Sequence, residues 1–86
     1  MGENEHRQIA RDSLFLLADM RVDGLSGDHK VRVRNVSAGG LMAEGGPVAQ
    51  RGTRVAIQLR NVGWVDGTIA WVHDTRCGIA FNEEID

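Results

Sequence analysis

The sequence contains one cysteine, one proline, no tyrosine and only four aromatic residues among 86. The single cysteine, Cys77, excludes a disulfide within the chain. The longest strongly apolar run, residues 14–18, is far shorter than the roughly 20 residues that a membrane-spanning helix needs. The first residues also lack the charged and then apolar pattern of a signal peptide. We therefore expect a cytoplasmic protein without membrane insertion.

Strong positive charge is missing as well. The formal net charge is -2 at pH 7, whereas a general nucleic-acid binder carries a strongly basic face. A small barrel that binds single strands would also present a row of aromatic side chains. We therefore expect no nucleic-acid polymer as a partner. Nine of the ten basic residues are arginines, which favours bidentate recognition of phosphate or planar groups.

Catalytic and metal-binding patterns are not apparent. Ser37 has no nucleophile-elbow context and no evident base, and the carboxylates are dispersed. No Lys-Ser/Thr pair follows the glycine pair at 39 and 40, as a phosphate loop requires. The possible metal ligands lack paired spacing on one element: His6, His29, His73 and Cys77. We expect no enzyme, no metal and no cofactor.

Alternating apolar residues and turn signals predict six short strands. Their expected ranges are 14–22, 30–34, 41–43, 55–60, 64–73 and 76–81. Residues 48–52 are expected to form a loop with one helical turn, the Asp74-Thr75 pair a tight hairpin, and His29 an exposed loop edge. With eleven glycines and no helical period, this pattern favours an all-β antiparallel barrel, since closure removes exposed strand edges.

The chain is short enough to form a single domain over residues 1–86. Within it we expect an N-terminal arm at residues 1–11 that is loose without ligand, a barrel at 12–82 and a short tail at 83–86. Phe15 and Leu17 make the first strand apolar on its outer side as well, so a terminal segment, the arm or a partner should cover them.

The most informative stretch is residues 35–40, which closes the second strand. Asn35 and Ser37 are two residues apart and would share one face of an extended backbone. Gly39 and Gly40 would let a ligand approach the main chain closely. This arrangement indicates a ligand-binding corner. The alternative is that both polar side chains only satisfy the turn through hydrogen bonds to the backbone.

Arg7 and Arg11 supply a second pattern in the polar N-terminal arm. Two guanidinium groups four residues apart suit phosphate oxygens or the O6/N7 edge of guanine, both of which accept paired hydrogen bonds. An RxxxR arm followed by [D/N]xSxxG resembles the PilZ domain, a bacterial receptor module for cyclic di-GMP. Residues 52–55, 67–71 and 78–81 are similar to later strands of the same family.

The resemblance implies a six-stranded barrel, with little or no C-terminal helix in this chain. It implies that cyclic di-GMP binds through residues of both motifs and through an indole: Arg7, Arg11, Asn35, Ser37, Gly39, Gly40 and Trp71. Asn35 stands where the family more often has Asp, so it keeps an acceptor oxygen without the charge. By alternation Trp71 shares a face with Ile69 and Val65 and belongs to the core, and the alternative is a stacking surface for guanine.

The expected function is that of a receptor that orders its arm for a downstream partner. The alternative is a PilZ-like adaptor that binds proteins and no nucleotide. Trp64, on the opposite face from Trp71, either packs under a loop or marks a partner surface. We expect a monomer or a weak homodimer, and the sequence leaves open whether one or two ligand molecules bind.

Overall fold

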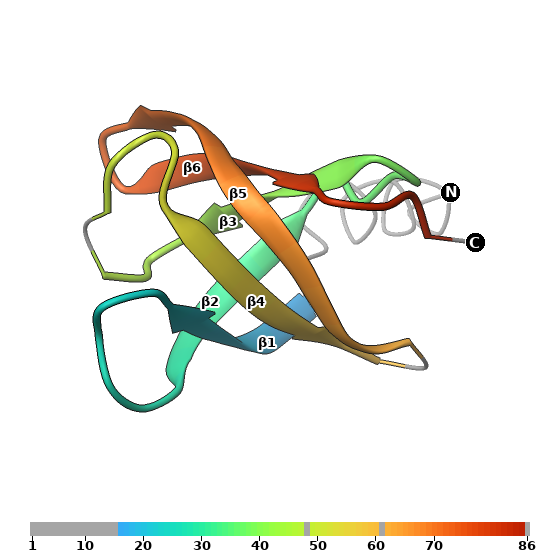
Figure 1. Ribbon diagram of the computed structural model, residues 1–86, viewed down its shortest axis with the longest axis horizontal. Coiled ribbons are helices and arrows are strands. Elements are labelled where there is room, and N and C mark those ends of the chain that lie inside the picture. The colour runs from blue at the N-terminus through green and yellow to red at the C-terminus, as the bar shows by residue number, and fades with distance from the viewer. Residues whose placement is uncertain (1–15, 48, 61, 86) are drawn as a thin grey trace, which may run out of the picture.

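The computed structural model describes residues 16–47, 49–60 and 62–85. These residues form six strands and no helix. Every pairing is antiparallel, and the strands close into a barrel in the order β1-β2-β3-β6-β5-β4, with β4 returning to β1 (Figure 1). The strands are β1 Leu16–Val22, β2 His29–Arg34, β3 Gly40–Glu44, β4 Arg54–Leu59, β5 Gly63–His73 and β6 Arg76–Phe81. The predicted all-β barrel is confirmed.

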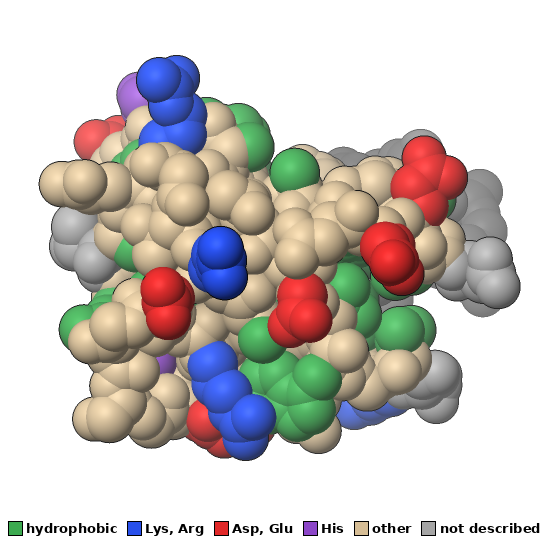
Figure 2. Space-filling model, viewed as in Figure 1, with side chains coloured by type: hydrophobic (Ala, Val, Ile, Leu, Met, Phe, Trp, Pro, Cys, Tyr) green, Lys and Arg blue, Asp and Glu red, His purple; other side chains and the backbone are tan. Residues whose placement is uncertain are grey.

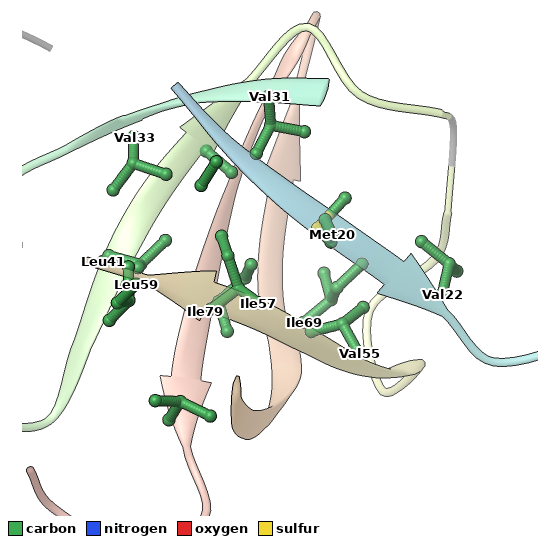
Figure 3. Packing of buried hydrophobic residues seen from close by; sticks show 13 residues of the cluster. Met20, Val22, Val31, Val33, Leu41, Val55, Ile57, Leu59, Ile69 and Ile79 are labelled. Atoms are coloured by element: carbon green, nitrogen blue, oxygen red, sulfur yellow. The ribbon is translucent and has the colours of Figure 1, made fainter. Parts of the chain in front are cut away.

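The barrel interior is filled by apolar side chains from all six strands (Figure 3). Met20 and Ile57, which face each other across the β1–β4 seam, are at most 1% exposed. No polar or charged residue in the described part of the chain is buried. The full cluster is Ala18, Met20, Val22, Val31, Val33, Leu41, Ala43, Val55, Ile57, Leu59, Val65, Ile69 and Ile79. The alternation of apolar and polar residues along each strand therefore explains which side chains are buried.

The hairpin of β5 and β6 contains a tight turn and a β-bulge. β5 and β6 are joined by the predicted two-residue turn, because His73 pairs with Arg76 and Asp74 has a φ of 57°. Positive φ at the first turn residue is typical of the tight hairpin turns that match strand twist. Further along the same ladder, the register shifts between Ile69 and Trp71. Ala70 is the extra residue of this β-bulge.

Several local expectations were wrong. Residues 49–53 contain a turn at Arg51 and Gly52 and no helical residue. His29 begins β2, where it pairs with Met20, so it is half-buried and its Nε2 atom is enclosed. Leu16 lies on the same side of β1 as the core residues of that strand, but it is 42% exposed and not buried as the alternation predicts.

The outer side of β1 remains open in the described structure. Leu17 is 66% exposed, so no described segment covers it as expected, and Phe15 lies outside the described residues. The described residues contain no helix that is long and apolar enough to cross a membrane, and no group of three side chains placed to hold a metal ion.

Candidate ligand-binding face

The turn at residues 35–40 begins with a residue in the left-handed backbone region. Asn35 follows β2 directly and has a φ of 56°. Asparagine tolerates this conformation better than most residues because its short polar side chain bonds locally. Asn35 therefore leaves the extended conformation, and the expected extended backbone that would place Asn35 and Ser37 on one face is absent. Both side chains are nevertheless exposed in the same turn.

Ser37 closes this turn through two contacts with one carbonyl. Its backbone N–H donates to the Gly40 oxygen at 2.8 Å, and its hydroxyl donates to the same oxygen at 3.3 Å. This geometry supports the alternative that the Ser37 side chain satisfies the turn by bonding to the backbone. The hydroxyl oxygen keeps acceptor capacity, so the same side chain could still receive a hydrogen bond from a ligand.

The two glycines of the turn have different surroundings. A Cβ atom added to Gly39 would meet nothing within 4 Å, and Gly39 is exposed. A Cβ atom added to Gly40 would overlap the carbonyl oxygen of Ile79 on β6. Gly40 is therefore required by close strand packing, whereas Gly39 leaves its backbone open to a ligand.

A row of four residues crosses the outer surface next to the turn. Arg34 on β2 pairs with Met42 on β3, Met42 pairs with Gly78 on β6, and Gly78 pairs with Trp71 on β5. Adjacent strands lie about 4.8 Å apart, so the row follows roughly 14 Å of curved surface, halfway around the closed ring of six strands. Met42 lies between two buried residues of β3 and therefore faces outward. The row provides a cation at one end and an indole at the other.

Trp71 is 43% exposed, so its default assignment to the core was wrong. The bulge at Ala70 reverses the alternation after Ile69, which remains buried at 2% exposed. The indole then lies over Gly78, because a Cβ atom at Gly78 would overlap its Nε1 and meet its Cδ1 at 2.6 Å. The aromatic face is thus held against the barrel wall and partly open to solvent, as a stacking surface requires.

Charged side chains flank this row. In the next row, Arg32 pairs with Glu44, Glu44 with Arg76, and Arg76 with His73. The Arg34 guanidinium approaches the Glu44 carboxylate at 3.9 Å. The face therefore combines arginines with one carboxylate, a mixture that matches a ligand carrying both phosphate groups and guanine N–H donors.

Cys77 also lies on β6, next to Gly78, and is half-buried. Burial raises the pKa of its thiol, and a backbone hydrogen bond at Ala43 opposes this effect. A thiol with a raised pKa is a poor nucleophile at neutral pH.

The structure brings four residues of the predicted site together in one turn, whereas Trp71 lies on β5, three strands away from β2 in the closed ring of six. Asn35, Ser37 and the glycines at 39 and 40 form one turn, and Trp71 lies in the row that begins at Arg34 beside that turn. Arg7 and Arg11 lie outside the described residues. Sequence reasoning missed Met42 and Gly78, because only the strand register shows that they link Arg34 to Trp71.

Comparison with known proteins gives one match. The family model described as "PilZ domain" matches residues 5–86, nearly the whole chain. No curated protein and no solved structure was matched.

Proposed function

Since this chain belongs to the PilZ domain family, which is known for binding cyclic di-GMP, we propose that it is a receptor for that dinucleotide. The family match, which spans both motifs, carries this proposal. The binding residues would be Arg7, Arg11, Asn35, Ser37, Gly39, Gly40 and Trp71. The outer surface supports the proposal, since it offers polar groups and an exposed indole at opposite ends of one cross-strand row that curves around the barrel from β2 to β5.

Each residue type has a distinct role in this proposal. Arg7 and Arg11 bind phosphate oxygens and guanine edges through paired hydrogen bonds. The Asn35 amide and the Ser37 hydroxyl accept hydrogen bonds from guanine N–H groups. The Gly39 backbone lies next to the ligand, and Trp71 stacks against a purine. Gly40 contributes by keeping the turn close to β6.

The proposed output is the ordering of the arm. Contacts from Arg7 and Arg11 to the bound nucleotide would fix residues 1–11 against the barrel, and a downstream protein would bind that state. Ordering of a short segment by charge-assisted contacts is a known switching device. Through this ordering, a barrel for which we propose no catalytic role would act in signalling.

Calorimetric titration of cyclic di-GMP into the domain tests the proposal, with an Arg7→Ala/Arg11→Ala double variant and GTP as controls. A hydrogen bond to a charged group contributes roughly 1.5–3 kcal/mol, so each arginine should be worth about tenfold to a hundredfold in affinity. Binding that is lost in the variant and absent with GTP would support a receptor. A loss of affinity under threefold in both single variants, Arg7→Ala and Arg11→Ala, would contradict the proposed binding of the ligand by these two arginines.

The second candidate is an adaptor that binds proteins without nucleotide. The Ser37 hydroxyl and Gly40 favour it, because the turn explains both residues without a ligand. Absence of heat and of chemical-shift changes in a folded sample would support this candidate over the receptor.

A further inference from the structure

The C-terminal segment, residues 82–85, runs beside the proposed binding turn (Figure 1). The Ile85 N–H donates to the Ala38 carbonyl at 2.9 Å, and the Phe81 N–H donates to the Gly39 carbonyl at 2.9 Å. The Ile85 side chain also packs against the core cluster. Two consecutive carbonyls of the turn are therefore bonded to the end of β6 and to the segment that follows it.

The Ala38–Gly39 peptide group has two sides with different neighbours. Its carbonyl points to Ile85, and in a planar trans peptide the N–H points the opposite way. The Gly39 N–H therefore points away from the C-terminal segment, and Gly39 itself is exposed. A ligand that bonds this N–H would fix the peptide plane and strengthen the hydrogen bond on its other side.

The C-terminal segment also forms one wall of a surface groove. The groove has a volume of about 420 Å³ and lies between this segment and the start of β5. Trp64 and Asp66 line its other wall, and the Asp66 carbonyl accepts a hydrogen bond from the Asn82 N–H at 3.0 Å. Acidic and hydrophobic side chains lie side by side on this part of the surface (Figure 2). A shift of residues 82–85 would therefore change the shape of this groove, although the turn at residues 35–40 does not line it.

We propose that the C-terminal segment 82–85 is a second output element, which transmits ligand occupancy from the Ala38–Gly39 peptide to the Trp64 groove through the Ile85–Ala38 hydrogen bond. This inference rests on the proposed binding of cyclic di-GMP at the turn. Coupling of this kind is reciprocal: if the ligand strengthens the Ile85 bond, the Ile85 bond must strengthen ligand binding by the same factor.

Hydrogen exchange of the unmodified protein provides the first test. We expect cyclic di-GMP to slow exchange of the Ile85 amide by at least fivefold, while GTP leaves it unchanged. Unchanged exchange at Ile85 under saturating cyclic di-GMP would overturn the coupling. This measurement needs no variant, so it does not depend on whether a substituted chain folds.

A matched pair of variants provides the second test. Ile85→Pro removes the N–H donor, whereas Ile85→Ala keeps the donor and removes most of the side chain. Because the coupling is reciprocal, loss of the bond lowers the affinity by the factor by which the ligand strengthens it. We therefore expect Ile85→Pro to bind cyclic di-GMP at least about fivefold more weakly than Ile85→Ala, the same factor as the expected slowing of exchange. Equal affinities of the two variants would overturn the coupling.

The free proteins distinguish this failure from failure of the proposed function. In the absence of ligand, the amide resonances of residues 37–40 should shift more in Ile85→Pro than in Ile85→Ala, because only proline removes the bond to Ala38. If the resonances shift but the unmodified protein gives no heat with cyclic di-GMP, the receptor function has failed, and the coupling fails with it. If the ligand binds and the two variants behave alike, only the coupling has failed.

Discussion

The indole of Trp71 lies over Gly78, its cross-strand neighbour on β6. Two features of the chain produce this contact: the bulge at Ala70 turns Trp71 outward, and the missing side chain at position 78 leaves room for the ring. The stacking surface of the proposed site thus depends on a residue without any side chain.

Replacement of Gly78 by alanine should displace the ring. A Cβ atom there would overlap the indole Nε1, and overpacking of this kind costs about 1–3 kcal/mol of stability. We expect a lower melting temperature and an affinity for cyclic di-GMP reduced about tenfold, since stacking contributes about 1–3 kcal/mol per base. In the Gly78→Ala/Trp71→Ala double variant the melting temperature should recover. A double variant no more stable than Gly78→Ala would contradict the contact.

Alanine substitutions at Gly39 and Gly40 should have different effects, one on ligand binding and the other on the stability of the fold. Gly39→Ala should leave the melting temperature within a degree or two, because the new methyl group meets nothing within 4 Å. It should still weaken cyclic di-GMP binding if the ligand approaches this backbone. Gly40→Ala should destabilise the fold by about 1–3 kcal/mol through its overlap with Ile79. Thermal denaturation and calorimetry on the same two variants distinguish the roles, and equal stabilities would contradict the assignment.

Substitutions of Asn35 should distinguish the role of its backbone conformation in stability from the role of its side chain in binding. Glycine accepts the φ of 56° without strain, so Asn35→Gly should retain stability and lose affinity. Asn35→Ala should lose affinity to the same extent and also about 1 kcal/mol of stability, because alanine is disfavoured in this region. Chemical denaturation and ligand titration measure the two effects.

Asn35→Asp tests the acceptor itself. A carboxylate forms stronger hydrogen bonds with N–H donors than an amide oxygen does, and the left-handed conformation suits Asp as well as Asn. We expect cyclic di-GMP to bind about threefold to tenfold more tightly to Asn35→Asp, as measured by calorimetry. Weaker binding would show that position 35 does not face a hydrogen-bond donor of the ligand.

Cys77 should make stability depend on pH in the alkaline range. Burial raises the pKa of its thiol above the usual value of 9.0, which the unfolded chain retains. At a pH between the unfolded and the folded pKa, the thiol of the unfolded chain has lost a proton that the folded chain keeps. Stability therefore falls as the pH rises through this window. Denaturant unfolding between pH 8 and 10.5 should show this decline, and Cys77→Ala should reduce it. An identical decline in the variant would assign the effect to other groups.

Much of the barrel follows from local patterns. The alternation around Val31 and Val33, and the turn at Asp74, place β2 and the β5–β6 hairpin within a residue of their observed bounds. These features depend on neighbouring residues and are therefore visible in a single sequence.

The features that sequence reasoning missed depend on partners far along the chain. The outward position of Trp71 follows from a bulge that only the pairing of β5 with β6 reveals. The contact between Ile85 and Ala38 joins residues that are distant in sequence. The left-handed Asn35 is a local feature, but a strand ending in Asn-Val-Ser is equally compatible with extended backbone, so its geometry was not determined by residue type.

The wholly apolar barrel interior has a consequence for how this domain can change over generations. Asn35, Ser37 and Trp71 are all exposed, and none of the described core residues belongs to the proposed site. Substitutions at these three positions leave the buried core unchanged, so the proposed specificity can change at a small cost in stability, such as the roughly 1 kcal/mol expected for Asn35→Ala. Among the described residues of the proposed site, Gly40 is the exception, because its close packing against Ile79 ties it to the fold.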